Sequence, residues 1–113
     1  MVKVYMAGAI GNADPVQCFR NIENGVDWSA QVLSLGCVSV YSPFIDHAMV
    51  ARSTLDMAAV YAHSIEWLKA CDCVFLVPGW ENSKGTAHEL EIAKECGMPV
   101  FTSLMEVYEY AKG

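Results

Sequence analysis

One acidic side chain in the segment GWENSKGTAHELEIA, residues 79–93, falls where a buried face is expected. The segment reads as a turn followed by a helix, and successive residues of a helix are rotated by about 100°. On that wheel Glu89 falls between Ala93 and Cys96, on the apolar side. A carboxylate on the inner face of a helix start can act as a nucleophile or anchor a hydroxyl group of a ligand. Glu89 is therefore a candidate catalytic residue.

The same segment also has the pattern of a helix cap. Thr86 and Glu89 match the capping box, in which Thr caps the helix and Glu reaches back to the cap amide. Ser83, Gly85 and Thr86 bring hydroxyls and backbone amides to this helix start, and such an end attracts phosphate. Ordinary turn chemistry explains these residues equally well. The chain has neither a nucleoside triphosphate loop nor the glycine fingerprint of a dinucleotide site.

Three further residues are candidates for lining a pocket. Tyr5 lies on the first predicted strand, and its hydroxyl needs a hydrogen-bond partner if the ring is buried. Gly8 follows that strand, and it either lets a ligand approach the backbone or simply makes the turn. Trp80 could stack on a base or cover the pocket, and a packing role fits it equally well. The histidines are dispersed without metal-ligand spacing, and we interpret them as loop or surface residues: His47, His63 and His88.

The composition indicates one domain that binds a small molecule. The chain has 113 residues, of which 54% are hydrophobic and 18% charged, and its net charge is −6. Its seven Lys and Arg residues are scattered, so the basic patch of a nucleic-acid-binding protein is missing. No apolar run approaches the roughly 18 residues of a membrane span. The start MVKVYMAGAIG reads as a strand rather than a signal peptide.

The five cysteines, an odd number, are typical of reduced thiols, and we expect a cytoplasmic protein. Cys71 and Cys73 are closer together than zinc ligands usually are, and Cys73 falls inside a predicted strand. We therefore predict no metal ion and no cofactor.

Segments typical of strands and of helices alternate along the chain, without a repeat or a linker. Strands are predicted at 2–7, 37–41, 72–77 and 99–103, helices at 14–36, 54–71, 85–97 and 104–113, and a polar loop at 42–53. This alternation predicts a parallel sheet with right-handed crossovers and helices on both faces. We expect a three-layer α/β/α fold of four or five parallel strands, similar to flavodoxin and Rossmann folds, as a single domain over residues 1–113.

This topology brings the candidate residues to one edge of the sheet. In such sheets ligands bind beyond the carboxyl ends of the strands, where the strand order reverses. If the first and third strands are neighbours, that edge collects the turns at 8–11 and 78–80 and the start of the helix that carries Glu89. The fold therefore puts the inward-facing carboxylate where a ligand would bind.

Two segments resemble the nucleoside 2-deoxyribosyltransferase superfamily: VYMAGAIG at 4–11 and WLKACDCVFLVPGWENSKGTAHELEIAKECGMPVF at 67–101. The second is closest to short relatives of the deoxyribosyltransferases and of the deoxynucleoside 5′-monophosphate N-glycosidases. The resemblance covers nearly the whole chain. It implies cleavage or transfer at the N-glycosidic bond of a deoxynucleoside or its 5′-monophosphate, through covalent catalysis by a Glu.

The resemblance also implies roles for individual residues. The nucleophile of the family falls on Glu89, and the tyrosine that positions it falls on Tyr5. The serine that holds the 5′-phosphate in the nucleotide-cleaving branch falls on Ser83. Residues that line the pocket in relatives fall on Gly8, Ile10 and Gly85.

One position departs from the family pattern. Relatives carry an Asp on the preceding helix, eight residues before the Asp that opens the third strand, and here that position is Ser64. The family Asp contacts the sugar and assists departure of the base, whereas a serine hydroxyl is a poor general acid at neutral pH. Ser64 falls on an apolar arc, so we expect it to face the site. His63 and Asp56 fall toward the other side of the wheel.

Two functions from different classes stay open. The first is an N-glycosidase or deoxyribosyltransferase, and the second is a catalytically weak or inactive nucleotide-binding or sensing module of the same fold. A flavin-binding protein of similar topology has no supporting loop. We expect a small-molecule nucleoside or nucleotide as partner, no nucleic acid and no membrane, and a homodimer or higher homo-oligomer.

Overall fold

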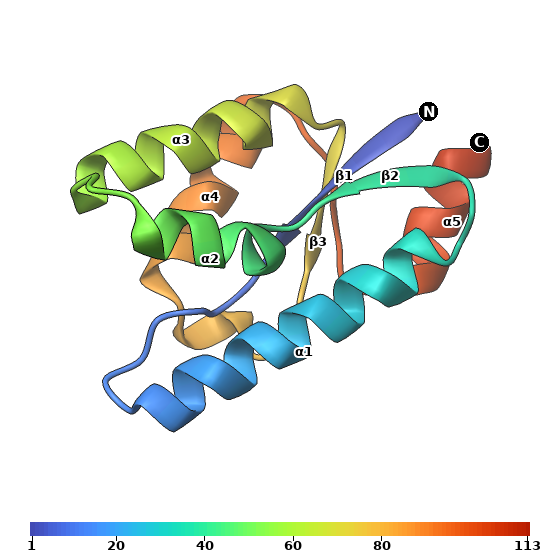
Figure 1. Ribbon diagram of the computed structural model, residues 1–113. Coiled ribbons are helices and arrows are strands. Elements are labelled where there is room, and N and C mark those ends of the chain that lie inside the picture. The colour runs from blue at the N-terminus through green and yellow to red at the C-terminus, as the bar shows by residue number, and fades with distance from the viewer.

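The computed structural model describes residues 1–113 and contains four strands and five α-helices (Figure 1). The strands are β1 (Val2–Ala7), β2 (Val38–Tyr41), β3 (Cys73–Leu76) and β4 (Val100–Phe101). The helices are α1 (Pro15–Leu33), α2 (Pro43–Arg52), α3 (Met57–Ala70), α4 (Lys84–Glu95) and α5 (Leu104–Lys112), and a 3-10 helix, η1 (Trp80–Asn82), precedes α4.

The four strands form one parallel sheet in the order β2-β1-β3-β4. β1 pairs with β2 on one side and with β3 on the other, where Tyr5 is in register with Val74. The strand order therefore reverses at β1, because the chain adds β2 on one side and then crosses to β3 on the other. The predicted α/β fold with a parallel sheet is confirmed, with four strands.

Alternate side chains of β1 face opposite sides of the sheet, as the pleat of a strand requires. Val4 and Met6 lie in the core that includes buried residues of α1 and α5, whereas Tyr5 and Ala7 lie in the core that includes buried residues of α3 and α4. Figure 1 shows the sheet between these two helical layers, with α3 and α4 on one side and α1 and α5 on the other. The ring of Tyr5 consequently lies on the side of α3 and α4.

The segment after β2 is a helix, where the sequence predicted a polar loop. Pro43 occupies the first turn of α2, where the backbone N–H groups have no partner within the helix, so the N–H that proline lacks costs no helical hydrogen bond. Phe44 is the only buried residue of α2, and its ring packs closely on the backbone of α1 at Gly25. This contact attaches α2 to the rest of the molecule.

The other predicted elements are present, with ends that differ by no more than three residues. The third helix begins at Met57 because Asp56 caps it, accepting a hydrogen bond from the backbone N–H of Ala59 at 2.9 Å. None of the helices combines the length and the hydropathy that crossing a bilayer requires.

Candidate active site

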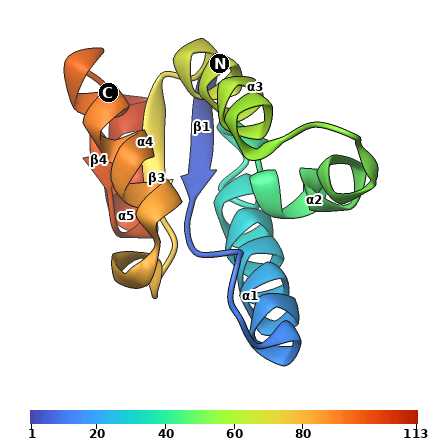
Figure 2. The ribbon, with the colours of Figure 1, turned by 90° about the vertical axis from the view of Figure 1, so that its left-hand side faces the viewer.

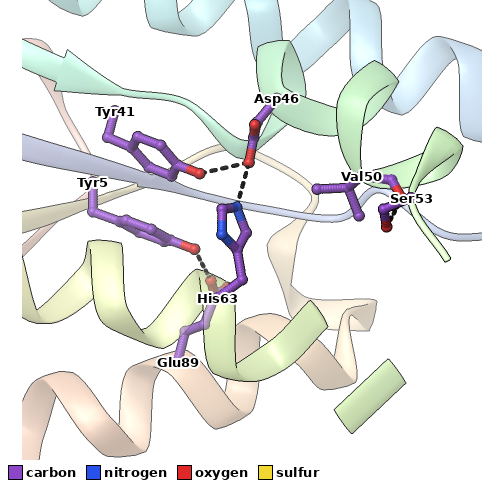
Figure 3. A network of polar contacts seen from close by, with 7 residues as sticks. All are labelled: Tyr5, Tyr41, Asp46, Val50, Ser53, His63 and Glu89. Atoms are coloured by element: carbon purple, nitrogen blue, oxygen red, sulfur yellow. Dashed lines mark hydrogen bonds and ion pairs between the residues drawn. The ribbon is translucent and has the colours of Figure 1, made fainter. Parts of the chain in front are cut away.

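Glu89 extends from α4 toward the sheet, where its carboxyl group meets the side chain of Tyr5 (Figure 3). Tyr5 is fully buried on β1, and its hydroxyl donates a hydrogen bond to Oε2 of Glu89. The prediction that a buried Tyr5 needs a partner for its hydroxyl is confirmed. That partner is the acidic residue that the sequence singled out.

The two faces of α4 explain why Glu89 turns inward. Thr86 and Ala93 are buried, Glu89 is partly buried on the same side, and Glu91 is exposed. The predicted helical wheel is confirmed for these positions. Cys96 is exposed instead, because it caps the end of the helix rather than belonging to its inner face.

The cap of α4 is Ser83, and the prediction that Thr86 caps the helix in a capping box is wrong. The Oγ atom of Ser83 accepts hydrogen bonds from the backbone N–H of Thr86 at 3.1 Å and from its hydroxyl at 3.0 Å. Thr86 is thus the third residue of the helix, and Glu89 lies one turn beyond the position from which a side chain reaches back to the cap. The carboxyl group of Glu89 is therefore free to bind Tyr5.

Burial raises the pKa of Glu89 from its usual 4.5 to about 7, although the hydrogen bond from Tyr5 opposes that rise. Burial and the adjacent Glu89 raise the pKa of Tyr5, so its hydroxyl keeps its proton and remains a donor at neutral pH. Glu89 consequently gains and loses its proton near neutrality. Carboxyl groups perturbed in this way are concentrated at functional sites.

A cavity of about 730 Å³ lies beside this pair, within the roughly 300–1,000 Å³ typical of small-ligand sites. Eight of the nine residues predicted for the site line it: Tyr5, Gly8, Ile10, Ser64, Ser83, Gly85, Thr86 and Glu89. Trp80 does not line it, because its partly buried side chain packs on the core between the sheet and helices α3 and α4. The interpretation of Trp80 as a packing residue is the one that this position favours.

The sequence model of one protein family matches residues 2–102, and its description is "Domain of unknown function (DUF4406)". The chain belongs to the DUF4406 family. No curated protein matches the chain. All four strands and every residue that lines the cavity fall within the matched range. Because the family description names no activity, the function has to be argued from the site.

A second polar cluster, centred on Asp46, reaches the cavity of this DUF4406 domain through that residue (Figure 3). Oδ2 of Asp46, on α2, accepts a hydrogen bond from the hydroxyl of Tyr41 at 2.7 Å and lies 2.8 Å from Nε2 of His63. Burial opposes ionisation of Asp46, but the bonds from Tyr41 and His63 hold its pKa below the usual value. Two carboxyl groups therefore line the cavity of the DUF4406 domain, and their pKa values are shifted in opposite directions: that of Glu89 is raised and that of Asp46 is lowered.

Stacked aromatic rings connect the two clusters. The ring of Tyr41 lies between those of Tyr5 and Trp67, with centroid distances of 5.6 Å and 4.8 Å. Such stacking restricts the movement of a ring beyond what burial alone achieves. The hydroxyls that hold Glu89 and Asp46 are therefore positioned by one shared stack.

The sequence analysis missed Asp46 and misread His47 and His63. Asp46 and His47 line the cavity from α2, the helix that was expected to be a loop. His63 is partly buried against Asp46 and is not a simple surface residue, whereas His88 is exposed, as predicted, although it also lines the cavity. Pro43 was the available signal, because proline is common in the first turn of a helix.

The DUF4406 domain has no group of three or more His, Cys, Asp or Glu side chains arranged to hold a metal ion. Cys71 and Cys73 are both buried free thiols. Burial raises the pKa of Cys71 to about 11 and that of Cys73 to about 12, which disfavours the thiolate that metal binding or nucleophilic chemistry requires.

Proposed function

We propose that this protein breaks the N-glycosidic bond of a deoxynucleoside or a deoxynucleoside 5′-monophosphate, with Glu89 as the nucleophile. The observation that carries the proposal is the Tyr5–Glu89 hydrogen bond at the wall of the cavity. It fixes one carboxyl oxygen of Glu89 and leaves the other without a partner in the chain, available to attack an electrophilic carbon. The resemblance of residues 4–11 and 67–101 to the nucleoside 2-deoxyribosyltransferase superfamily makes a deoxyribose carbon the favoured electrophile.

The reaction would proceed in two displacements. A carboxylate oxygen of Glu89 bonds to the anomeric carbon of the sugar, and the bond from that carbon to the base breaks, its electron pair leaving with the base. The departing base takes up a proton from solvent water. Water then attacks the same carbon and loses a proton, the sugar–Glu89 ester bond breaks, and the carboxylate is restored. If a second base attacks in place of water, the product is a new nucleoside.

Only the ionised form of Glu89 can be the nucleophile. Because its pKa is about 7, the ionised fraction in the free protein grows as the pH rises through neutrality. The rate of base release at low substrate concentration should follow that fraction. The hydrogen bond from Tyr5 assists, since it stabilises the ionised form against the effect of burial.

The start of α4 favours a substrate with a phosphate group. The hydroxyl of Ser83 accepts two hydrogen bonds from Thr86 and donates none within the chain, so its own proton is available to a ligand. Free backbone N–H groups at a helix start attract anions, and Lys84 lines this part of the cavity. We assign the 5′-phosphate of the substrate to this end.

Release of free base from a panel of deoxynucleosides and their 5′-monophosphates tests the proposal. The protein should release base from at least one of them, and Glu89→Gln should lower the rate by roughly 10³-fold or more, because the nucleophile is lost. Gln keeps the shape of Glu and can still accept a hydrogen bond from Tyr5. Glu91→Gln, on the exposed side of the same helix, is the matched control and should keep the wild-type rate. Equal rates in Glu89→Gln and wild-type protein would contradict the assignment.

A nucleotide-binding or sensing protein without turnover is the second candidate, and Ser64 favours it. Ser64 lines the cavity at the position where the resembling superfamily carries an Asp that assists departure of the base. Neither neighbour is free to replace that Asp, because Asp56 caps α3 and His63 is bonded to Asp46. Losing a general acid typically lowers a rate by about 10²–10⁴-fold. Thermal stabilisation by a deoxynucleotide without released base would support this second candidate.

A further inference from the structure

We propose that Asp46 binds the exocyclic amino group of the nucleobase, so that the cavity prefers an amino-bearing base, such as cytosine or adenine, to the corresponding keto base. The inference rests on the proposed nucleotide substrate, but it does not depend on the cleavage step.

One oxygen of Asp46 is fixed and the other is available. Oδ2 is held by the Tyr41 hydroxyl at 2.7 Å and by Nε2 of His63 at 2.8 Å, whereas Oδ1 has no hydrogen-bond partner in the chain. Oδ1 is not sealed inside the protein, because no fully buried side-chain oxygen or nitrogen of the molecule lacks a partner. Because Asp46 lines the cavity, a carboxylate oriented through Oδ2 and accessible at Oδ1 is a prepared acceptor for an N–H group of a ligand.

Asp46, Glu89 and Ser83 are arranged across the sheet in the order of three neighbouring strands. Asp46 follows β2, the Glu89 carboxyl group is bound to Tyr5 on β1, and Ser83 follows β3. Figure 2 shows α2 and the beginning of α4 on opposite sides of the end of β1. The base, sugar and phosphate of a nucleotide are joined in the same linear order. With the sugar at Glu89 and the phosphate at Ser83, the base extends toward Asp46.

The cavity wall around Asp46 suits a nucleobase. Most of the other side chains that α2, α3 and their connection contribute to it are apolar: Val50, Ala51, Leu55, Met57, Val60 and Ile65. Apolar walls with a few well-placed polar groups are typical of sites for flat, partly polar ligands. Apart from Glu89, Asp46 is the only carboxylate that lines the cavity. Any N–H group of the base at this end therefore has Asp46 as its acidic partner.

The shape of the base determines which N–H group that is. The 4-amino group of cytosine and the 6-amino group of adenine project from the edge of the base that lies away from the glycosidic bond. A carboxylate accepts a hydrogen bond from such an amine, whereas it repels the carbonyl oxygen that uracil or hypoxanthine has at the same position. The keto bases also have an N–H group on the ring next to that carbonyl. This group does not project beyond the ring as an exocyclic amine does, and a carboxylate that approaches it also meets the repelling carbonyl oxygen. The amino base should therefore bind more tightly than its keto counterpart.

Calorimetric titration with matched ligands measures this preference. The ligand pairs are deoxycytidine against deoxyuridine 5′-monophosphate, and deoxyadenosine against deoxyinosine 5′-monophosphate. Titrating into Glu89→Gln protein prevents consumption of the ligands. In at least one pair the amino member should bind about tenfold tighter or more, as for one added hydrogen bond to a charged group.

Asp46→Asn, made in the same background, should reduce that ratio to about one or reverse it, because the Asn amide can donate to the keto oxygen. Asp27→Asn, on the exposed surface of α1 and without a side-chain hydrogen bond in the chain, is the matched control and should leave the ratio unchanged. Equal affinities within both ligand pairs overturn the inference, and this comparison does not depend on whether an Asp46 variant folds. The inference is also overturned if Asp46→Asn weakens the binding of both members of a pair to the same extent. Failure of the proposed cleavage is seen separately, as a wild-type protein that binds these ligands but releases no base.

Discussion

Glu89 is held in a place that favours its neutral form, while the proposed chemistry needs its ionised form. Burial raises its pKa from 4.5 to about 7, and the hydroxyl of Tyr5 moves the pKa partly back. The folded protein therefore binds a proton at Glu89 more tightly than the unfolded chain does between these two values. This difference makes the side chain a measurable source of pH-dependent stability, whether or not turnover occurs.

The free energy of unfolding should show this dependence when the wild type is compared with Glu89→Gln. Because the pKa of Glu89 is higher in the folded state, its contribution is fully present below about pH 4.5 and is lost as the pH rises through about 7. Relative to Glu89→Gln, the wild type should lose on the order of 3 kcal/mol between about pH 4.5 and about pH 8. Urea unfolding of both proteins across this range measures it. A difference that stays constant with pH would mean that Glu89 has an ordinary pKa.

At the scale of the elements, α2 depends on the contact between Phe44 and α1. A Cβ atom on Gly25 would lie 2.1 Å from the ring of Phe44, so glycine alone fits at this position. Phe44 is two residues before Asp46 on the same helix, and the contact therefore also determines where Asp46 meets the cavity. The contact between Phe44 and α1 lies outside the cavity, but it positions Asp46, which lines the cavity.

Overpacking a core usually costs about 1–3 kcal/mol. Alanine within a helix regains about 1 kcal/mol relative to glycine. Gly25→Ala should consequently destabilise the protein by a net amount of up to about 2 kcal/mol. Gly11→Ala is the matched control, because a Cβ atom there meets nothing within 4 Å. Denaturant unfolding gives both free energies. A Gly25→Ala protein as stable as the wild type would show that α2 is attached to α1 in some other way.

At the scale of the whole molecule, the site consists of residues that are distant in sequence. Tyr5 and Glu89 are 84 positions apart, and they meet because β1 is central in the sheet and α4 packs on its face. This meeting was predictable from the alternation of strands and helices, since parallel strands end at one edge, and from the wheel that turned Glu89 inward. The alternation also predicted the parallel α/β fold, and eight of the nine residues predicted for the site line the cavity, a third of its 24 lining residues.

The Asp46 cluster was not predictable in the same way. Its helix buries only Phe44 and leaves Ile45 and Met49 exposed, so α2 has no apolar periodicity that marks an inner face. The cap at Ser83 was missed for a related reason. Ser83 and Thr86 are both good capping residues, and only the three-dimensional path of the chain decides between them.

The central claim is that Glu89 becomes covalently attached to the sugar, and mass spectrometry of the protein quenched with acid during turnover tests it most directly. The substrate is whichever deoxynucleotide releases its base fastest. After peptic digestion, the peptide that includes Glu89 should carry the added mass of the deoxyribosyl phosphate, and fragmentation should locate it on Glu89 rather than on Glu91. Base release without any adduct, or with the adduct on another residue, would contradict the assignment of Glu89 as the nucleophile.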